Sequence, residues 1–159
     1  MSNLDYLIPK EIIRNCDLEL LNMELVLTST SANGQWPKAR IIVDGKIIDD
    51  LVIEETATIK YKTTLDKDKK TINLAIERYG KTNKDTVISA TGDILENQEL
   101  TISKWILNEV DIVHSNLIYA LGKQTRFLTP EQRAYFIEHG ISTDPSSSIC
   151  MGENASWDI

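Results

Sequence analysis

The sequence is poor in the residues that most often carry catalysis or bind structural metals. Its 159 residues include two histidines and two cysteines, and neither cysteine belongs to a CxxC pair. A zinc site needs closely spaced Cys and His pairs, and a nucleophilic triad needs a histidine beside an orienting acid. A phosphate loop is also lacking, because Gly80-Lys81-Thr82 matches only the end of a Walker A motif. We therefore predict no catalytic residue, no cofactor and no metal ligand set, and hence no enzyme.

Positive charge is also scarce. Seventeen Lys and Arg stand against 24 Asp and Glu, giving a formal net charge of −7. Nucleic-acid binding and docking on an anionic membrane both depend on clustered basic residues, so neither is expected. No apolar run approaches the roughly 20 residues that span a bilayer. The segment Met1-Ser2-Asn3-Leu4-Asp5-Tyr6 lacks the basic and apolar regions of a signal peptide. These observations favour a chain made in the cytoplasm.

The two cysteines, Cys16 and Cys150, lie far apart in the sequence. In a cytoplasmic chain they would be two reduced, buried thiols. A disulfide joining the two ends of the chain is the alternative.

Short segments of alternating side-chain character recur along the middle of the chain, separated by turn signals. This pattern is typical of antiparallel β-sandwiches and barrels. The expected strands cover Leu18–Thr28, Arg40–Val43, Lys46–Ile48, Leu51–Glu54, Thr56–Thr63, Thr71–Tyr79, Asp85–Ile88, Glu99–Leu107, Val110–Val113 and Leu117–Tyr119.

Two features of this pattern are specific. Asp44-Gly45 between two β-branched runs predicts a hairpin with a type I′ turn, in which both central residues need a positive φ. Asp49-Asp50 interrupts the second run. In Glu99–Leu107, Leu100, Ile102 and Ile106 are expected to point inward, and Trp105 to belong to the core.

One short helix is predicted near the C-terminus. Thr129 stands at the N-cap, Pro130 at the first helical position and Gln132 three residues after the cap, which is a capping box. Gly140 is a natural stop. We therefore predict an all-β fold, an antiparallel, jelly-roll-like β-sandwich with one short C-terminal helix. An N-terminal arm (1–17) would precede the sandwich (18–127), and the helix and a C-terminal tail (128–159) would follow.

Few polar clusters suggest chemistry. His114 lies beside Ser115 and three residues after Asp111. If these side chains converged in a deep pocket, they would support the alternative that the protein is an enzyme. His139 suits the C-terminal end of the predicted helix dipole. Carboxylates gather in the segments 44–55 and 85–99. They form either a solubilising rim or a calcium site built at sandwich loops.

Aromatic residues are the better candidates for contacts with a ligand. Trp36 precedes Pro37 in a predicted loop, where it either packs structurally or offers an exposed platform for a sugar ring. Tyr79 ends a predicted strand, and Trp157 lies in the C-terminal tail, which is either a last strand or a docking peptide. Trp36, Tyr79 and Trp157 are thus the candidate contacts for a glycan or a partner.

The stretch from Ala39 to Asp111 resembles the small β-sandwich module of calcium-dependent xylan-binding domains. The resemblance rests on three segments: Ile41-Ile42-Val43-Asp44-Gly45-Lys46, Thr71-Ile72-Asn73-Leu74-Ala75-Ile76 and Glu99-Leu100-Thr101-Ile102-Ser103-Lys104-Trp105-Ile106-Leu107-Asn108. The family's calcium site uses an Asp where this chain has Ser103. The resemblance therefore implies the fold and not the calcium ligands.

Similar modules with a Gly-Lys-Thr step, here Gly80-Lys81-Thr82, occur in virion proteins of tailed bacteriophages. The segment Met151-Gly152-Glu153-Asn154-Ala155-Ser156-Trp157 is similar to the closing segment of those proteins. The resemblance implies a structural or adaptor subunit of the virion (decoration, tail, baseplate or fibre attachment). It would act through other virion subunits in a homo- or hetero-oligomer. The alternative is a carbohydrate-binding module that recognises host glycans, with or without calcium.

Overall fold

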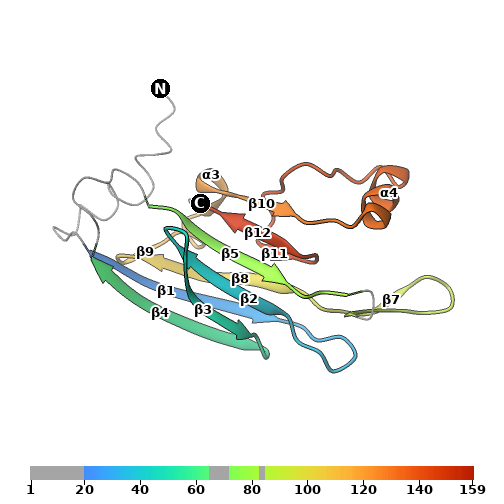
Figure 1. Ribbon diagram of the computed structural model, residues 1–159, viewed down its shortest axis with the longest axis horizontal. Coiled ribbons are helices and arrows are strands. Elements are labelled where there is room, and N and C mark those ends of the chain that lie inside the picture. The colour runs from blue at the N-terminus through green and yellow to red at the C-terminus, as the bar shows by residue number, and fades with distance from the viewer. Residues whose placement is uncertain (1–19, 65–71, 83–84) are drawn as a thin grey trace.

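The computed structural model describes residues 20–64, 72–82 and 85–159, which fold into two antiparallel sheets packed face to face (Figure 1). The N-terminal arm predicted for 1–17 and Cys16 lie outside the described residues. The β-sandwich predicted from the sequence is confirmed.

The first sheet contains the long strands β1 and β8. Its order is β11 (Cys150–Met151), β8 (Leu100–Leu107), β1 (Leu20–Ser29) and β4 (Thr56–Thr64), with β9 (Val110–Asp111) also pairing with β8.

The second sheet joins the middle of the chain to its last strand. Its order is β10 (Lys123–Arg126), β12 (Ala155–Asp158), β5 (Leu74–Tyr79), β2 (Lys38–Val43) and β3 (Lys46–Val52). Because β12 lies between β10 and β5, the segment after residue 127 belongs to the sandwich. The boundary predicted at residue 127 does not separate two structural units, since the edge of β5 is completed by a strand some 80 residues later in the chain.

Two strands and two short helices complete the described part of the fold. β6 (Thr86–Ile88) and β7 (Ile94–Asn97) pair with each other and form a ribbon that extends from one end of the sandwich (Figure 1). The helix α3 (Ile118–Leu121) covers one turn, and α4 (Pro130–Glu138) is the predicted C-terminal helix. Among the described residues, no helix is long and apolar enough to cross a membrane.

The core lies between the two sheets, and the period-two pattern fills it. On β1, Leu21, Met23, Leu25 and Leu27 are all buried, while the residues between them are more exposed. Trp105 on β8 is fully buried, as predicted. Alternation along a strand sends every second side chain to the same face, so each long strand contributes a row of apolar side chains to one shared core.

A β-bulge on β8 changes which of its residues face inward. Val26 pairs with Lys104 and Leu27 with Ile102, so Ser103 has no partner in the register with β1. The extra residue shifts the alternation by one. Leu100 and Ile102 are buried as predicted, but beyond the bulge Leu107 is buried and Ile106 is not. The prediction for Ile106 was therefore wrong.

The local turn predictions are confirmed. Asp44 and Gly45 have φ values of 49° and 78°, as a type I′ turn requires. At α4, Thr129 accepts the backbone N–H of Gln132, and the Gln132 side chain accepts the backbone N–H of Thr129, which completes the capping box.

Two local predictions were wrong. Asp49-Asp50 does not interrupt the strand, because β3 runs through both residues and Asp50 forms an ion pair with Arg40 on the neighbouring strand. Leu117–Tyr119 forms no strand, because Ile118 begins the helix α3. Three consecutive apolar residues fit both the helical and the strand periodicity, so contacts with the rest of the chain decide which structure forms.

Candidate functional site

A cleft of about 500 Å³ opens where three loops meet at the end of β5. Its walls come from the loop before β2, the last residues of β5 and the two ends of the β6–β7 ribbon. The cleft is lined by Asn33, Gln35, Trp36, Lys38, Tyr79, Gly80, Thr82, Asp85 and Gln98. The structure thus brings together two of the three aromatic contacts predicted from the sequence, Trp36 and Tyr79.

A tight turn places Trp36 at the cleft. Ala32 and Gln35 exchange two backbone hydrogen bonds of 3.1 and 2.9 Å, and the Asn33-Gly34 step between them has positive φ at both residues. Trp36 follows this turn directly and is half-buried. Its indole N–H has no acceptor among the described residues, so it remains available to a ligand hydroxyl.

Tyr79 is held by its neighbours on the second sheet. The Arg40 guanidinium lies 3.7 Å from the ring centroid, and the phenol hydroxyl donates to the Asp50 carboxylate. That hydrogen bond raises the pKa of Tyr79 above its ordinary value. Arg40 is fixed in turn by Glu77 at 2.7 Å. One face of the Tyr79 ring is thus covered, and only the opposite face can stack on a ligand.

Gln98 connects the cleft to the interior. It is buried, accepts a 2.8 Å hydrogen bond from Arg78 Nη2 and donates a 3.1 Å hydrogen bond to the carbonyl of Gln35. Arg78 is itself fully buried and donates to the carbonyl of Met151. Burial lowers the pKa of Arg78 to about 10, and nearby carboxylates led by Glu153 partly oppose the shift, so the guanidinium is charged at neutral pH.

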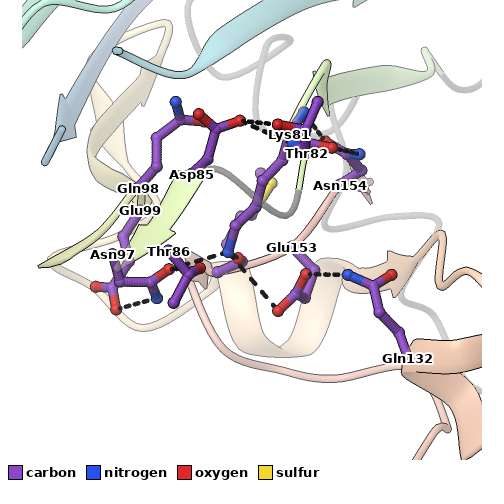
Figure 2. A network of polar contacts seen from close by, with 12 residues as sticks. Lys81, Thr82, Asp85, Thr86, Asn97, Gln98, Glu99, Gln132, Glu153 and Asn154 are labelled. Atoms are coloured by element: carbon purple, nitrogen blue, oxygen red, sulfur yellow. Dashed lines mark hydrogen bonds and ion pairs between the residues drawn. The ribbon is translucent and has the colours of Figure 1, made fainter. Parts of the chain in front are cut away.

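Asp85 forms the polar floor of the cleft. It is buried and accepts the backbone N–H of Thr82 at 2.7 Å, and its own carbonyl accepts the N–H of Gln98 at 3.0 Å. Figure 2 shows Asp85 and Gln98 side by side, opposite Lys81 and Thr82. The cleft therefore combines aromatic side chains with amide and carboxylate groups that are held by hydrogen bonds.

Trp157, the third predicted contact, is a core residue. It is fully buried on β12, and its indole N–H donates a 2.7 Å hydrogen bond to the carbonyl of Ser148. Neither a glycan nor a partner can reach it in this fold. The tail is a last strand and not a docking peptide, because β12 pairs along both edges, with β5 and with β10.

The histidines do not assemble a catalytic group. His114 Nδ1 lies 2.9 Å from the Asp111 carboxylate on an exposed turn. The Ser115 hydroxyl donates instead to the backbone carbonyl of Asp111 at 2.6 Å. Asp111 also accepts the backbone N–H groups of Val113 and His114, so its role is to cap the turn.

The carboxylates do not converge on a cation position. Among residues 20–64, 72–82 and 85–159, no three His, Cys, Asp or Glu side chains are placed to share a metal ion. Ser103 shares a 2.6 Å hydrogen bond with Thr28.

Comparisons with known proteins place the chain in no family. No family model matches it, and no curated protein matches it. A solved structure described as "vCBM60 in complex with galactobiose" is similar to it, with a TM-score of 0.47 and 11% identity. The match covers 86% of this chain and 95% of the other.

Sequence reasoning missed the polar half of the cleft. The Asn33-Gly34 turn signal beside Trp36 could have indicated Asn33 and Gln35, since a tight turn displays its side chains at the surface. No local signal marks Asp85 or Gln98. They flank the β6–β7 ribbon and reach the cleft only because the two ends of the ribbon return to the same place.

Proposed function

We propose that this chain is a non-catalytic binding protein and that its cleft recognises a carbohydrate. The observation that carries the proposal is the joint presence of Trp36 and Tyr79 with buried amide and carboxylate groups in one cleft of about 500 Å³. A volume of this order suits a small ligand such as one or two sugar rings.

The physical argument concerns the two kinds of surface that a sugar presents. The C–H faces of a pyranose ring pack on an aromatic face, while its hydroxyls need donors and acceptors around the rim. Trp36 supplies an aromatic surface and an indole N–H that has no acceptor among the described residues, and Asp85 and Gln98 supply polar atoms whose positions are fixed by their own hydrogen bonds. Such preorganisation lowers the entropy that ligand binding must overcome.

A glycan array identifies the ligand, and titration calorimetry of the best binder then tests the site. We expect Trp36→Ala to weaken binding at least about tenfold, as truncation of a central aromatic anchor does. Tyr135→Ala is the matched control, because Tyr135 is also an aromatic residue with a polar group but is exposed on α4. This substitution should leave the affinity unchanged. Running both with and without calcium shows whether an ion takes part. An array with no binder, or equal losses for the two variants, would reject the proposal.

A second candidate function is that of a structural or adaptor subunit in a bacteriophage virion, assembled with other virion subunits after synthesis in the host cytoplasm. It is supported by apolar side chains exposed on the outlying elements. Ile88, Ile94 and Leu95 of the β6–β7 ribbon are 59%, 63% and 65% exposed. Burial of exposed apolar groups of this kind against a partner protein is favourable and would stabilise the complex.

Mass photometry of the purified chain, alone and with candidate virion proteins, tests this second function. Assembly into an oligomer that Ile94→Asp and Leu95→Asp abolish would support it. A strict monomer that binds no virion component would count against this second function. The glycan-binding proposal is tested separately and would not be affected by that result.

A further inference from the structure

Lys81 lies in an unusually enclosed position for a lysine. It lies two residues after the end of β5, its side chain is only 6% exposed, and its Nζ lies 3.0 Å from Oδ1 of Asn97 (Figure 2). The same amine donates to the backbone carbonyl of Gly152. A lysine buried this deeply usually pairs with a carboxylate, but the nearest polar groups here are a carboxamide and a peptide carbonyl.

The carboxamide of Asn97 is fixed at both ends. Its Oδ1 accepts the hydroxyl of Thr86 at 2.8 Å as well as the Lys81 amine, and its Nδ2 donates to Glu99 Oε1 at 3.1 Å. An ammonium can only donate, so the oxygen must face Lys81 and the amide nitrogen must face Glu99. The carbonyl is thereby polarised toward attack, and the amide nitrogen lies against a carboxylate that can relay a proton.

A second carboxylate stands on the other side of the amine. Glu153 Oε1 lies 3.8 Å from Lys81 Nζ, and the other Glu153 oxygen is held by the Gln132 side chain at 3.0 Å. Burial lowers the pKa of Lys81, and the attraction of Glu153 only partly opposes this. A lowered pKa enlarges the fraction of neutral amine, which is the nucleophilic form.

We propose that Lys81 and Asn97 react with each other to form an intramolecular isopeptide bond. Glu153 takes a proton from the Lys81 ammonium, and the neutral Nζ attacks Cγ of Asn97. The hydroxyl of Thr86 stabilises the negative charge that develops on Oδ1. As the tetrahedral intermediate collapses, the Glu99 carboxylate, which accepts a hydrogen bond from Nδ2, takes the second Nζ proton and delivers it to Nδ2, and the Cγ–Nδ2 bond breaks.

The atoms and charges of this reaction balance without any reactant from outside the protein. One Nζ–Cγ bond forms, one Cγ–Nδ2 bond breaks, and Nδ2 leaves as ammonia, which takes up the proton first given to Glu153. No electron is gained or lost. The amine and the carboxamide are held together by the fold, so the reaction has the advantage of proximity.

The bond would join the segment after β5 to the last residue of β7. It would close the base of the β6–β7 ribbon covalently and tie it to the second sheet. Gln98, which follows Asn97 and lines the cleft, would be fixed by the same link. This inference does not depend on what the cleft binds.

The intact mass of the purified full-length chain tests the proposal directly. We expect a mass about 17 Da below that of the linear sequence, the mass of one lost ammonia. Trypsin should then yield Tyr79–Lys84 covalently attached to Asp85–Lys104, because acylated Lys81 is no longer a cleavage site. A succinimide at Asn33-Gly34 also loses ammonia, but it leaves these two peptides separate.

Variants identify the reacting groups. Lys81→Arg and Asn97→Ala should both restore the full mass and release the linear peptides, while Lys123→Arg, which changes an exposed lysine on β10, should keep the deficit. Glu153→Gln should slow the reaction at least about tenfold, as loss of a general base does. Folded wild-type chain that keeps its full mass and linear peptides after incubation at about pH 9, where more of the amine is neutral, would overturn the proposal.

Discussion

Gly122 shows how a single missing side chain permits the sandwich to close. A Cβ built at this position would lie 2.6 Å from the Trp157 ring and closer still to the Asp158 carbonyl oxygen. Its φ of −152° is available to any residue, so glycine is needed here for space and not for backbone freedom. The close approach lets Trp157 fill the core beneath the end of α3.

We expect Gly122→Ala to lower the free energy of unfolding by about 1–3 kcal/mol, the usual cost of overpacking. Chemical denaturation measures the change. Gly152→Ala is the matched control, because the nearest atom to its added Cβ is the Asn97 side-chain nitrogen at 4.0 Å. Equal effects of the two substitutions would show that packing against Trp157 is not the cause.

Asp111 links the stability of the α3 region to pH. Burial tends to raise its pKa, but the hydrogen bonds from the backbone N–H groups of His114 and Val113 outweigh this and lower it. A carboxyl group with a lowered pKa in the folded state stabilises the fold above its unfolded-state pKa, near 4. That stabilisation disappears as the pH falls through the folded-state pKa.

The difference in stability between wild type and Asp111→Asn should therefore be largest above about pH 4 and should shrink at lower pH. Urea midpoints measured from about pH 6 down to about pH 2 give this comparison. Glu54→Gln, which alters an exposed carboxylate, serves as the control. A difference that stays constant across the range would show that the Asp111 charge is not involved.

At the scale of elements, α4 depends on its cap more than on packing. None of its residues is buried, and Tyr135 and Ile137 are 54% and 66% exposed. A helix of nine residues is marginal in water without tertiary contacts. The reciprocal hydrogen bonds between Thr129 and Gln132, together with Pro130, therefore account for much of its local stability.

We expect Thr129→Ala to cost about 1 kcal/mol of local stability, and amide exchange in α4 to become several times faster. Hydrogen exchange read by mass spectrometry resolves this helix from the sheets. Thr58→Ala, at an exposed site on β4, should leave exchange in α4 unchanged. Unaltered exchange in α4 after removal of Thr129 would mean that packing holds the helix after all.

At the scale of the whole molecule, the last strand completes the second sheet. β12 pairs with β5 on one side and β10 on the other, and it carries Ala155 and Trp157 into the core. β11 adds Met151, which is also fully buried. The core is thus assembled from segments at widely separated positions in the chain, which makes folding dependent on long-range contacts.

A chain ending at residue 127 should therefore fail to fold, because it lacks a central strand and the large Trp157 side chain. The dispersion of amide signals in an NMR spectrum measures this. Replacement of residues 129–140 by a Gly-Ser linker should preserve the fold, because α4 buries no residue. A folded 1–127 fragment would show that the sandwich forms without β11 and β12.

The sequence by itself determined the fold class, the Asp44-Gly45 hairpin, the capped helix and part of the core. Each of these depends on residues close together in the chain, whose spacing and backbone preferences are visible without coordinates. Leu100 and Ile102 are buried because strand periodicity directs them to one face. Trp36 and Tyr79 were identified by the same local reasoning and lie at the cleft.

Tertiary structure alone decided the rest. The bulge at Ser103 reversed the orientation expected of Ile106, and β12 took Trp157 from a proposed surface into the core. Lys81 and Asn97 lie 16 positions apart, and Lys81 and Glu153 lie 72 apart, yet the three side chains meet. The pairing of distant strands sets such contacts, and it depends on the summed burial of the whole core and not on any local pattern.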